Sequence, residues 1–295
     1  LSGYYSHLLQ KRWEFLYPSQ TRKGTEKQQS PPRLPVSFSS AVTDERHNVF
    51  SEIKNTAPTF SLGAMKGVRS YLPKNQPELK LISLEDVVVE PVRWLWYPYI
   101  PLGKLSILHG DPGEGKTTLA LWIAAACSRG LALPGGETGE PLTVLYQTAE
   151  DGLGDTIKPR LLESQADLHH IYTIDETDFP LSMLDHRIGE AIEKTHAQLM
   201  ILDPMQAYLG EKVDMNRANE VRNVMKGLTK VASQTGCAIV LVGHLNKSQS
   251  INSAQRGLGS MDFRAAARSV LLVGRLKNDR DIRVMVHDKS SLAPE

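Results

Sequence analysis

The amino-acid sequence predicts an α/β fold, with a mainly parallel β-sheet flanked by helices and a poorly structured N-terminal extension in front of it. The first observation behind this prediction is that short apolar runs alternate with longer helical segments from Leu102 onward. Strands that alternate with helices indicate βαβ units, whose strands lie parallel in one sheet. The second observation is that residues 18–40 consist mostly of Pro, Ser, Gln, Thr, Lys and Arg without apolar periodicity, which is typical of a linker.

The predicted strands and helices follow one another along the second part of the chain. The last two predicted strands have no helix between them, so we expect them to form an antiparallel hairpin at the edge of the sheet. We expect strands at Lys104–His109, Thr143–Gln147, Ile171–Ile174, Leu199–Asp203, Ala238–Gly243, Ser269–Gly274 and Ile282–His287, and helices at Thr117–Ser128, Gly154–Gln165, Leu184–Thr195 and Ala218–Thr235.

The N-terminal part of the chain carries weaker signals. We expect a short helix over Tyr4–Leu16 and place the domain boundary near Leu81. The predicted organisation is an N-terminal extension and linker over residues 1–81 and a folded α/β domain over residues 82–295. The chain begins with Leu1 and not with Met, which indicates a fragment or a processed chain.

Composition limits the classes of protein to which the chain can belong. The formal net charge is +1, from 34 Lys and Arg against 33 Asp and Glu, so any contact with nucleic acid must come from a local group of cations. Cys127 and Cys237 are far apart in sequence, which leaves a zinc ribbon or a disulfide framework unsupported. The chain has no apolar run of about 18 residues and no basic-then-apolar signal pattern at its start. We therefore expect no membrane partner and a cytoplasmic location.

A glycine-rich segment carries the strongest functional signal. It fits the pattern GxxxxGK[ST], and it stands between a predicted strand and a predicted helix, the context that this motif requires. Its glycines let successive backbone N–H groups point at phosphate oxygens, and the start of the helix adds its dipole. Lys116 is expected to reach the β- and γ-phosphates of ATP, and the Thr117 hydroxyl to bind Mg²⁺. A glycine-rich turn that matches by chance is the alternative. The segment is Gly110, Asp111, Pro112, Gly113, Glu114, Gly115, Lys116, Thr117 and Thr118.

Two further predicted strands end in carboxylates. Asp203 ends an apolar strand and is expected to hold the shell of the Mg²⁺ ion. Glu150 and Asp151 follow another strand, between the glycine-rich segment and Asp203. A carboxylate there can orient and deprotonate the water that attacks the γ-phosphate, and we assign this role to Glu150. The alternative is that these two acids only cap the helix that follows.

A fourth strand ends at His244, followed by Leu245, Asn246 and Lys247. Its polar end beside a predicted ATP site indicates a sensor of the γ-phosphate, and a merely structural histidine is the alternative. The run 246–249 superficially resembles the guanine-binding pattern NKxD. Gln249 lacks the carboxylate that would bind the guanine amino group, so we exclude a GTPase.

Taken together, the glycine-rich segment, the strand end TAED, the strand LMILDP and the run VGHLNKS resemble the RecA-like P-loop ATPases. The resemblance covers residues from about 94 to 295 and is to the RepA-type hexameric helicase branch, the AAA_25 family. It implies ATP and Mg²⁺ as cofactors, with Glu150 as catalytic base, Asp203 as the acid of the Mg²⁺ shell and His244 as γ-phosphate sensor.

The same resemblance implies a homo-oligomer, most simply a hexamer, in which a neighbouring subunit completes each ATP site with a cation. Arg268 best matches the place of this cation in the family, directly before the sixth strand of the sheet. Arg264 and Lys289 are the alternatives. Ser291 stands where relatives often carry an Arg, which leaves a paired Lys/Arg finger at Lys289 unsupported.

Single-stranded DNA is the expected partner of the loop after His244. In RecA-like hexamers this loop faces the central channel, and Lys247 and Arg256 are its natural phosphate ligands. An ordinary surface loop is the alternative, because the segment has no aromatic side chain on which a base would stack. By analogy with phage and plasmid relatives, a primase or another replication protein is a further candidate partner.

The sequence therefore predicts an ATP-hydrolysing hexameric motor, a replicative DNA helicase of a plasmid, phage or mobile element. Two alternatives remain open. One is a regulatory ATPase like the KaiC-type relatives, which does not translocate, and the other is a strand-exchange recombinase. Stimulation of ATP hydrolysis by single-stranded DNA separates the motor from the regulator.

Overall fold

The computed structural model describes residues 13–15, 79–210, 213–215, 217–244 and 261–293. The chain divides into two units, one formed by Leu1–Lys23 with Pro91–Glu295 and the other by Gly24–Glu90. In the second unit, Leu84–Asp86 form a single 3-10 turn, η4, and the Ser83 side chain accepts a hydrogen bond from the Glu85 N–H. The first unit contains the sheet and the candidate site, and the domain boundary near Leu81 stays a prediction.

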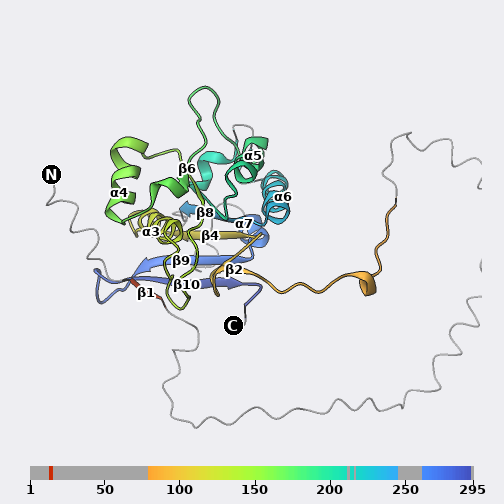
Figure 1. Cartoon of the computed structure of the whole chain (residues 1–295), viewed down its shortest axis with the longest axis horizontal. Helices are drawn as coiled ribbons and strands as arrows, with labels where there is room; N and C mark the ends of the chain where they lie inside the picture. The colour runs from red at the N-terminus through yellow and green to blue at the C-terminus, as the bar shows by residue number, and fades with distance from the viewer. Residues whose placement is uncertain (1–12, 16–78, 211–212, 216, 245–260, 294–295) are drawn as a thin grey trace, which may run out of the picture. The chain divides into compact units, whose positions relative to one another are not determined.

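The first unit is built on a mainly parallel sheet, as predicted (Figure 1). Its strand order is β1-β10-β9-β4-β8-β7-β5-β6, and β2 pairs with β3 in a separate hairpin. Of the pairs in the large sheet, β9–β10 is antiparallel and the others are parallel. The strands are β1 (Trp13–Phe15), β2 (Trp94–Trp96), β3 (Ile100–Pro101), β4 (Leu105–Gly110), β5 (Val144–Thr148), β6 (Ile171–Tyr172), β7 (Leu199–Asp203), β8 (Ala238–His244), β9 (Ser269–Arg275) and β10 (Arg283–Ser290).

Helices cover both faces of this sheet. In Figure 1, α3 and α4 lie together on one side of the view and α5, α6 and α7 gather on the other. The helices are α3 (Lys116–Ser128), α4 (Lys158–Glu163), α5 (His186–Thr195), α6 (Ala218–Thr235) and α7 (Met261–Ala266), with the short turns η5 (Leu153–Ile157), η6 (Leu168–His170) and η7 (Met205–Tyr208).

The prediction of a helix that reaches Leu16 is wrong at Trp13–Phe15. These residues form β1, which pairs in parallel with Arg283–Met285 of β10. The free edge of a strand offers unpaired N–H and C=O groups, and pairing with this edge outweighs a weak local preference for helix. The predicted hairpin of the last two strands is antiparallel, but β10 is not the outermost strand, because β1 lies beyond it.

Two other elements are shorter than the sequence predicts. The helix expected over Gly154–Gln165 is a π-helical turn, η5, followed by the short helix α4. Pro159 at the start of α4 has no N–H, so it cannot donate a hydrogen bond to a carbonyl of η5. Strand β6 ends at Tyr172 and not at Ile174. The Gln147 side chain takes the place of a strand partner there, since it accepts hydrogen bonds from the Ile174 N–H and the Thr173 hydroxyl, each at 3.0 Å.

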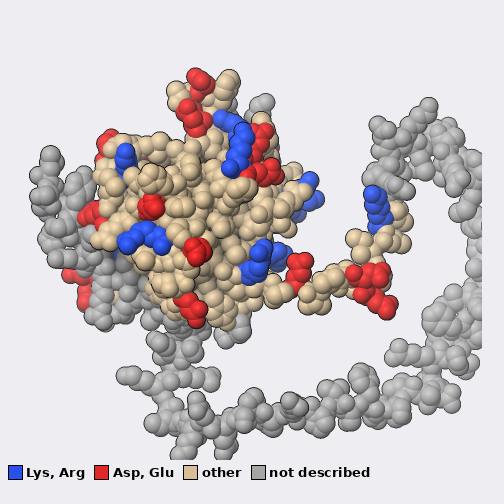
Figure 2. All heavy atoms as spheres, viewed as in Figure 1, with Lys and Arg blue, Asp and Glu red and all other residues tan. Residues whose placement is uncertain are grey.

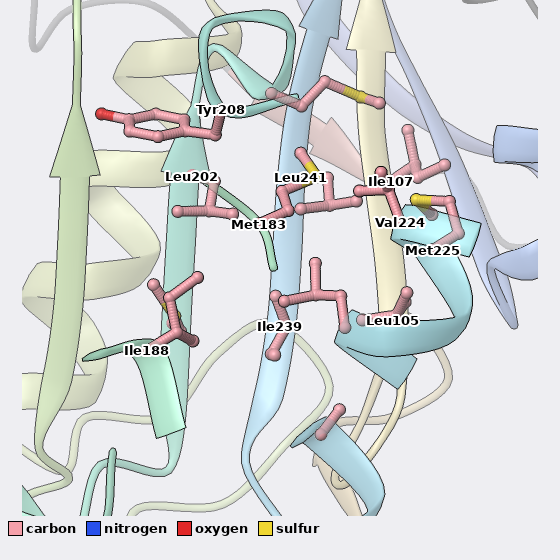
Figure 3. Close-up of a cluster of buried hydrophobic side chains, with 14 of the residues drawn as sticks. Leu105, Ile107, Met183, Ile188, Leu202, Tyr208, Val224, Met225, Ile239 and Leu241 are labelled. Carbon is pink, nitrogen blue, oxygen red and sulfur yellow. The ribbon is translucent and has the colours of Figure 1, made fainter. Parts of the chain in front are cut away.

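One hydrophobic core lies between the sheet and helices α5, α6 and α7. Helix α6 is amphipathic, with apolar residues three and four positions apart that face the sheet, as one buried stripe of a helix requires. Alternate residues of the central strands point into this core because strand side chains alternate between the two faces. Figure 3 shows Leu105 and Ile107 of β4, Leu202 of β7, Ile239 and Leu241 of β8, and Val224 and Met225 of α6 in this cluster.

A second core covers the opposite face of the sheet, where α3 packs. The middle of α3 is buried all around, and the small side chains of Ala124 and Ala125 let it lie close to the strands. Trp96 and Tyr99 close this core at one end, with their ring centroids 4.8 Å apart. Because α3 begins at Lys116, the tight packing of this helix fixes the position of the glycine-rich segment. None of the helices in the described ranges has the length and apolar character needed to span a bilayer.

Candidate nucleotide-binding and hydrolysis site

The glycine-rich segment forms a loop between β4 and α3, as its sequence context predicts. Gly113 and Gly115 have φ angles of 80° and 96°, a left-handed conformation that residues with a Cβ rarely adopt. Gly115 is also crowded, since a Cβ there would lie 2.7 Å from Nε of Arg283. These glycines let the loop curl around the space in front of the α3 N-terminus, where backbone N–H groups favour anions.

Lys116 points back into this loop. Its Nζ donates to the carbonyl oxygens of Gly110 at 3.0 Å and of Asp111 at 2.9 Å, and the residue is only 4% exposed. Burial lowers the pKa of Lys116, and the carboxylates of Asp203, Asp111, Glu114 and Glu150 oppose that shift. An ammonium held inside such a loop is positioned to meet the β- and γ-phosphates of a nucleotide.

Asp203 lies at the end of β7, beside the start of α3. Its Oδ2 accepts a hydrogen bond from the Tyr146 hydroxyl at 2.9 Å, and the Thr117 hydroxyl also bonds to this carboxylate. Burial raises the pKa of Asp203, the two hydrogen bonds oppose the shift, and Glu150 and Asp151 raise the pKa further. A buried carboxylate next to a threonine hydroxyl is a pair of hard oxygen donors, which fits Mg²⁺ in a phosphate-binding site.

Glu150 and Asp151 follow β5, the strand that pairs with β7 so that Thr148 lies opposite Asp203. Asp151 is engaged locally, since its Oδ2 lies 3.4 Å from Nη1 of Arg160 and its N–H donates to the Thr148 hydroxyl. Glu150 is exposed at the same edge of the sheet. The N-cap residue of the following helix η5 is Gly152, so neither acid occupies that position.

His244 ends β8 and lies opposite Gly110 in the parallel pairing of β8 with β4. It lines a cavity of about 200 Å³ together with Gly113, Gly115, Lys116, Thr117, Thr118 and Arg283. The His244 Nδ1 atom is buried and has no hydrogen-bond partner among the described residues. The carboxyl ends of β4, β5, β7 and β8 therefore bring together Lys116, Thr117, Asp203, Glu150 and His244.

Two arginines of the β9–β10 hairpin bind the backbone of the loop, and the sequence analysis did not single them out for the site. Arg275 donates from Nη2 to the Gly113 carbonyl at 2.7 Å, and its Nε lies 3.5 Å from Oε2 of Glu114. Arg283 is 2% exposed and donates from Nε to the Glu114 carbonyl at 3.0 Å. The signal available in the sequence was that Arg283 directly precedes the apolar run Val284–Val286 of β10.

A larger cavity, of about 670 Å³, lies beside the loop and not over the start of α3. The tip of the loop contributes Asp111, Pro112 and Glu114 to its wall, and the β9–β10 hairpin contributes Arg275, Lys277 and Arg280. His109 and Asp288 also line it. The smaller cavity, which holds Lys116 and Thr117, is the one that matches the phosphate chemistry.

The three candidate cations for a neighbouring ATP site do not join this group of residues. Arg268 is exposed, and its N–H donates to the carbonyl of Leu105, so it lies at the amino end of β4 while the phosphate loop follows the carboxyl end. The Arg264 guanidinium pairs with Asp288. Lys289 donates to three backbone carbonyls near the end of α7. The DNA-binding candidates Lys247 and Arg256 lie outside the described residues.

Comparison with known proteins adds a family to this geometry. The AAA domain family AAA_25 matches residues 74–250. The chain is similar to the DNA repair protein RadA of Halalkalibacterium halodurans, with 29% identity over 205 residues that cover 68% of this chain and 41% of that protein. The protein of the same name from Bacillus subtilis is 28% identical over 151 residues, 50% of this chain and 29% of its own length. That from Helicobacter pylori is 25% identical over 154 residues, 52% of this chain and 31% of its own length. The chain thus spans less than half the length of these curated relatives.

Proposed function

The chain belongs to the AAA_25 family of RecA-like P-loop ATPases, and from this membership we propose that it hydrolyses ATP to drive a motor on single-stranded DNA. The observation that carries the proposal is the meeting of Lys116, Thr117, Asp203, Glu150 and His244 at one edge of the sheet. Each of these residue types has a role in phosphoryl transfer that its place in the fold supports.

In the proposed reaction, Glu150 orients a water molecule for in-line attack on the γ-phosphorus of ATP. The attacking oxygen forms a bond to phosphorus while the bond between phosphorus and the β,γ-bridging oxygen breaks, and the proton of the water passes to the Glu150 carboxylate. Products are ADP and inorganic phosphate. Lys116 neutralises charge on the β- and γ-phosphates, where the backbone N–H groups of the loop also bind.

Thr117 and Asp203 are the residues that would hold Mg²⁺. A bound Mg²⁺ would supply positive charge that offsets the negative charge of the phosphates. Tyr146 keeps the Asp203 carboxylate in one orientation, because its hydroxyl occupies Oδ2. The His244 ring, with Nδ1 unpaired among the described residues, is suited to hydrogen-bond the γ-phosphate and to respond to its loss.

We further propose a homohexamer in which Arg268 of one subunit reaches the ATP bound by the next. Arg268 lies beside the amino end of β4, and the phosphate loop of its own chain follows the carboxyl end of that strand. A role of Arg268 in hydrolysis therefore requires a second copy of the chain. Among the three candidates, Lys289 and Arg264 already have partners within their own chain. Such a cation, supplied in trans, stabilises the charge of the transition state.

The proposed DNA contacts are Lys247 and Arg256. On the face shown in Figure 2, the described Lys and Arg side chains are interspersed with Asp and Glu, in line with the net charge of +1. A strand of DNA is therefore expected to bind through a small local set of cations, and the affinity to fall with rising salt in proportion to the number of phosphates contacted.

The test is the rate of ATP hydrolysis with and without single-stranded DNA. A motor is expected to accelerate several-fold with DNA, and the Lys116→Ala variant to lose most of its turnover. Equal rates with and without DNA would instead favour a regulatory ATPase that does not translocate. Near-normal turnover of Lys116→Ala would contradict the assignment of ATP hydrolysis to this site. Particle symmetry with an ATP analogue and DNA bound tests the hexamer.

The relatives named as DNA repair proteins favour a second candidate function, a DNA-dependent ATPase of repair or recombination and not of replication. The two candidates share the ATP site and differ in the DNA that is processed. Strand separation on a forked duplex supports the replicative helicase, whereas migration of a strand-exchange junction without unwinding of the fork supports the repair function.

A further inference from the structure

Two consecutive residues of β10, Asp288 and Lys289, bind the same helix. In a regular strand, neighbouring side chains point to opposite faces, so two neighbours do not reach one partner. The pairing of β10 with β9 shifts register between His287 and Lys289, which places Asp288 in a β-bulge. A bulge re-aims side chains, and here it lets both residues contact α7 or the residues next to it.

Lys289 binds the end of this helix. Its Nζ donates to the carbonyl oxygens of Arg264 at 2.8 Å, Ala265 at 3.2 Å and Ala267 at 2.8 Å. The last carbonyls of a helix have no partner within the helix, and a cation there also suits the helix dipole. All three hydrogens of the ammonium are thus used to fix the end of α7 to β10.

Asp288 links α7 to the strand that enters the phosphate loop. Its carboxylate pairs with the Arg264 guanidinium, and Nη2 of Arg264 also donates to the Asp288 carbonyl at 2.8 Å. The same carboxylate lies 3.4 Å from Nε2 of His109, a buried side chain of β4, in a close contact that is not a hydrogen bond. His109 is followed directly by Gly110, whose carbonyl accepts a hydrogen bond from Lys116.

These contacts form a short path from the phosphate loop, through His109 and Asp288, to Arg264 on α7. His109 and Asp288 also line the cavity of about 670 Å³ beside the loop. Helix α7 begins at Met261, immediately after the segment that carries the proposed DNA contacts. The path therefore joins the nucleotide site to the helix at the end of that segment.

We propose that Asp288 is a positioning residue that couples α7 to the phosphate loop. Nucleotide binding at the loop then makes α7 more stable against local opening. The coupling rests on the proposed binding of ATP. Lys289 acts with Asp288 by fixing the end of the helix, and Arg264 is the partner on α7. Coupling of two sites through one physical contact predicts that removal of the contact separates their responses.

Hydrogen exchange of the full chain, with and without Mg²⁺ and a non-hydrolysable ATP analogue, tests this coupling. In the wild type, the analogue is expected to slow exchange both in the loop, residues 110–118, and in α7. In Asp288→Ala, the loop is expected to remain protected while the protection of α7 by the analogue falls at least about fivefold. Asp281→Ala is the matched control, an exposed acid of the same hairpin, and it should behave as the wild type.

The comparison is made between the two nucleotide states of each variant, so a general loss of stability does not imitate the result. If Asp288→Ala does not fold, Arg264→Gln breaks the same contact from the other side. The proposal is overturned if the analogue protects α7 equally in the wild type and in these variants. It is also overturned if, in the wild type, the analogue slows exchange in the loop and leaves exchange in α7 unchanged. Failure of the wild-type loop to respond overturns the proposed ATP binding itself, which is a separate result.

Discussion

Tyr146 donates its phenolic hydrogen to Oδ2 of Asp203 over 2.9 Å, from the strand next to the one that Asp203 ends. Burial raises the pKa of Tyr146, so the hydroxyl remains a neutral donor near neutral pH. Tyr146→Phe removes this bond and leaves Asp203 less well oriented. We expect the Mg²⁺ concentration for half-maximal ATP hydrolysis to rise about tenfold, the lower end of effects seen when partners of metal ligands are removed.

A magnesium titration of the ATPase rate checks this prediction. Tyr172→Phe is the control, because Tyr172 lies on the neighbouring edge strand and is 47% exposed. An unchanged magnesium dependence in Tyr146→Phe would show that the Tyr146 hydroxyl only fills space beside Asp203.

Glu150 and Asp151 make a matched pair for locating the base. Glu150→Gln keeps the shape of the side chain and removes its charge, so turnover is expected to fall roughly 10²–10⁴-fold, the usual contribution of general-base catalysis. ATP affinity should stay nearly constant, because the effect is confined to the transition state. Asp151→Asn loses the ion pair with Arg160 and is expected to keep most of its turnover.

Rates and nucleotide affinities of the two variants are measured side by side. Loss of turnover in Asp151→Asn with normal turnover in Glu150→Gln would move the base to Asp151. Normal turnover in both variants would contradict a catalytic base at either of these acids.

Arg283 binds the backbone of the phosphate loop and lines the small cavity at that loop, so its removal tests how far the loop depends on the β9–β10 hairpin. Arg283→Gln loses a charge-assisted hydrogen bond to the Glu114 carbonyl, a type of bond worth about 1.5–3 kcal/mol. Since roughly 1.4 kcal/mol corresponds to a factor of ten, we expect the KM for ATP to rise at least about tenfold. Lys194→Gln, an exposed cation at the end of α5, is the control.

Steady-state kinetics together with urea unfolding distinguish the outcomes. A variant that is less stable but has a normal KM would show that Arg283 braces the fold and not the nucleotide site.

His109 gives stability a predictable dependence on pH. Burial lowers its pKa from 6.5 to about 4, and Arg264 and Lys116 add to the shift. Below pH 6.5 the unfolded chain takes up a proton that the folded chain accepts only near pH 4. The stability contributed by neutral His109 is therefore complete above pH 6.5 and is lost as the pH falls from 6.5 towards 4.

From pH 7.5 to pH 5, this single group is expected to lower the free energy of unfolding by about 2 kcal/mol. Urea unfolding of the wild type and of His109→Gln at both values measures it, because the variant lacks the titrating group. Identical pH dependence in the two proteins would contradict the assignment of the buried proton site to His109.

The parts of the site that follow the strands could be predicted from the sequence. The predicted strands lead into the polar residues of the site, and parallel strands place their carboxyl ends at the same edge of the sheet. The sequence therefore predicts that Lys116, Asp203, Glu150 and His244 share this edge, while their closeness depends on the strand order β4-β8-β7-β5 that the structure supplies. The structure places them at this edge, although their roles stay predictions.

The contacts of Arg275 and Arg283 could not be predicted in the same way. They depend on the β9–β10 hairpin lying next to β4, and strand order arises from packing between distant segments and not from a local pattern. The partners of Asp288 and Lys289 could not be predicted for a related reason. A bulge changes the direction in which a side chain points and leaves no mark in the alternation of apolar and polar residues.

The short ends of the sheet have a consequence for how copies of the chain can associate. At one edge, β6 ends at Tyr172, where the Gln147 amide satisfies the backbone of Ile174; at the other edge, the part of β1 that the structure describes is Trp13–Phe15. Very short edge strands offer few free backbone groups to a strand from another molecule, which is how natural sheets avoid growing without limit. If copies of the chain associate as proposed, we therefore expect them to meet through side-chain surfaces and not through pairing of these edge strands.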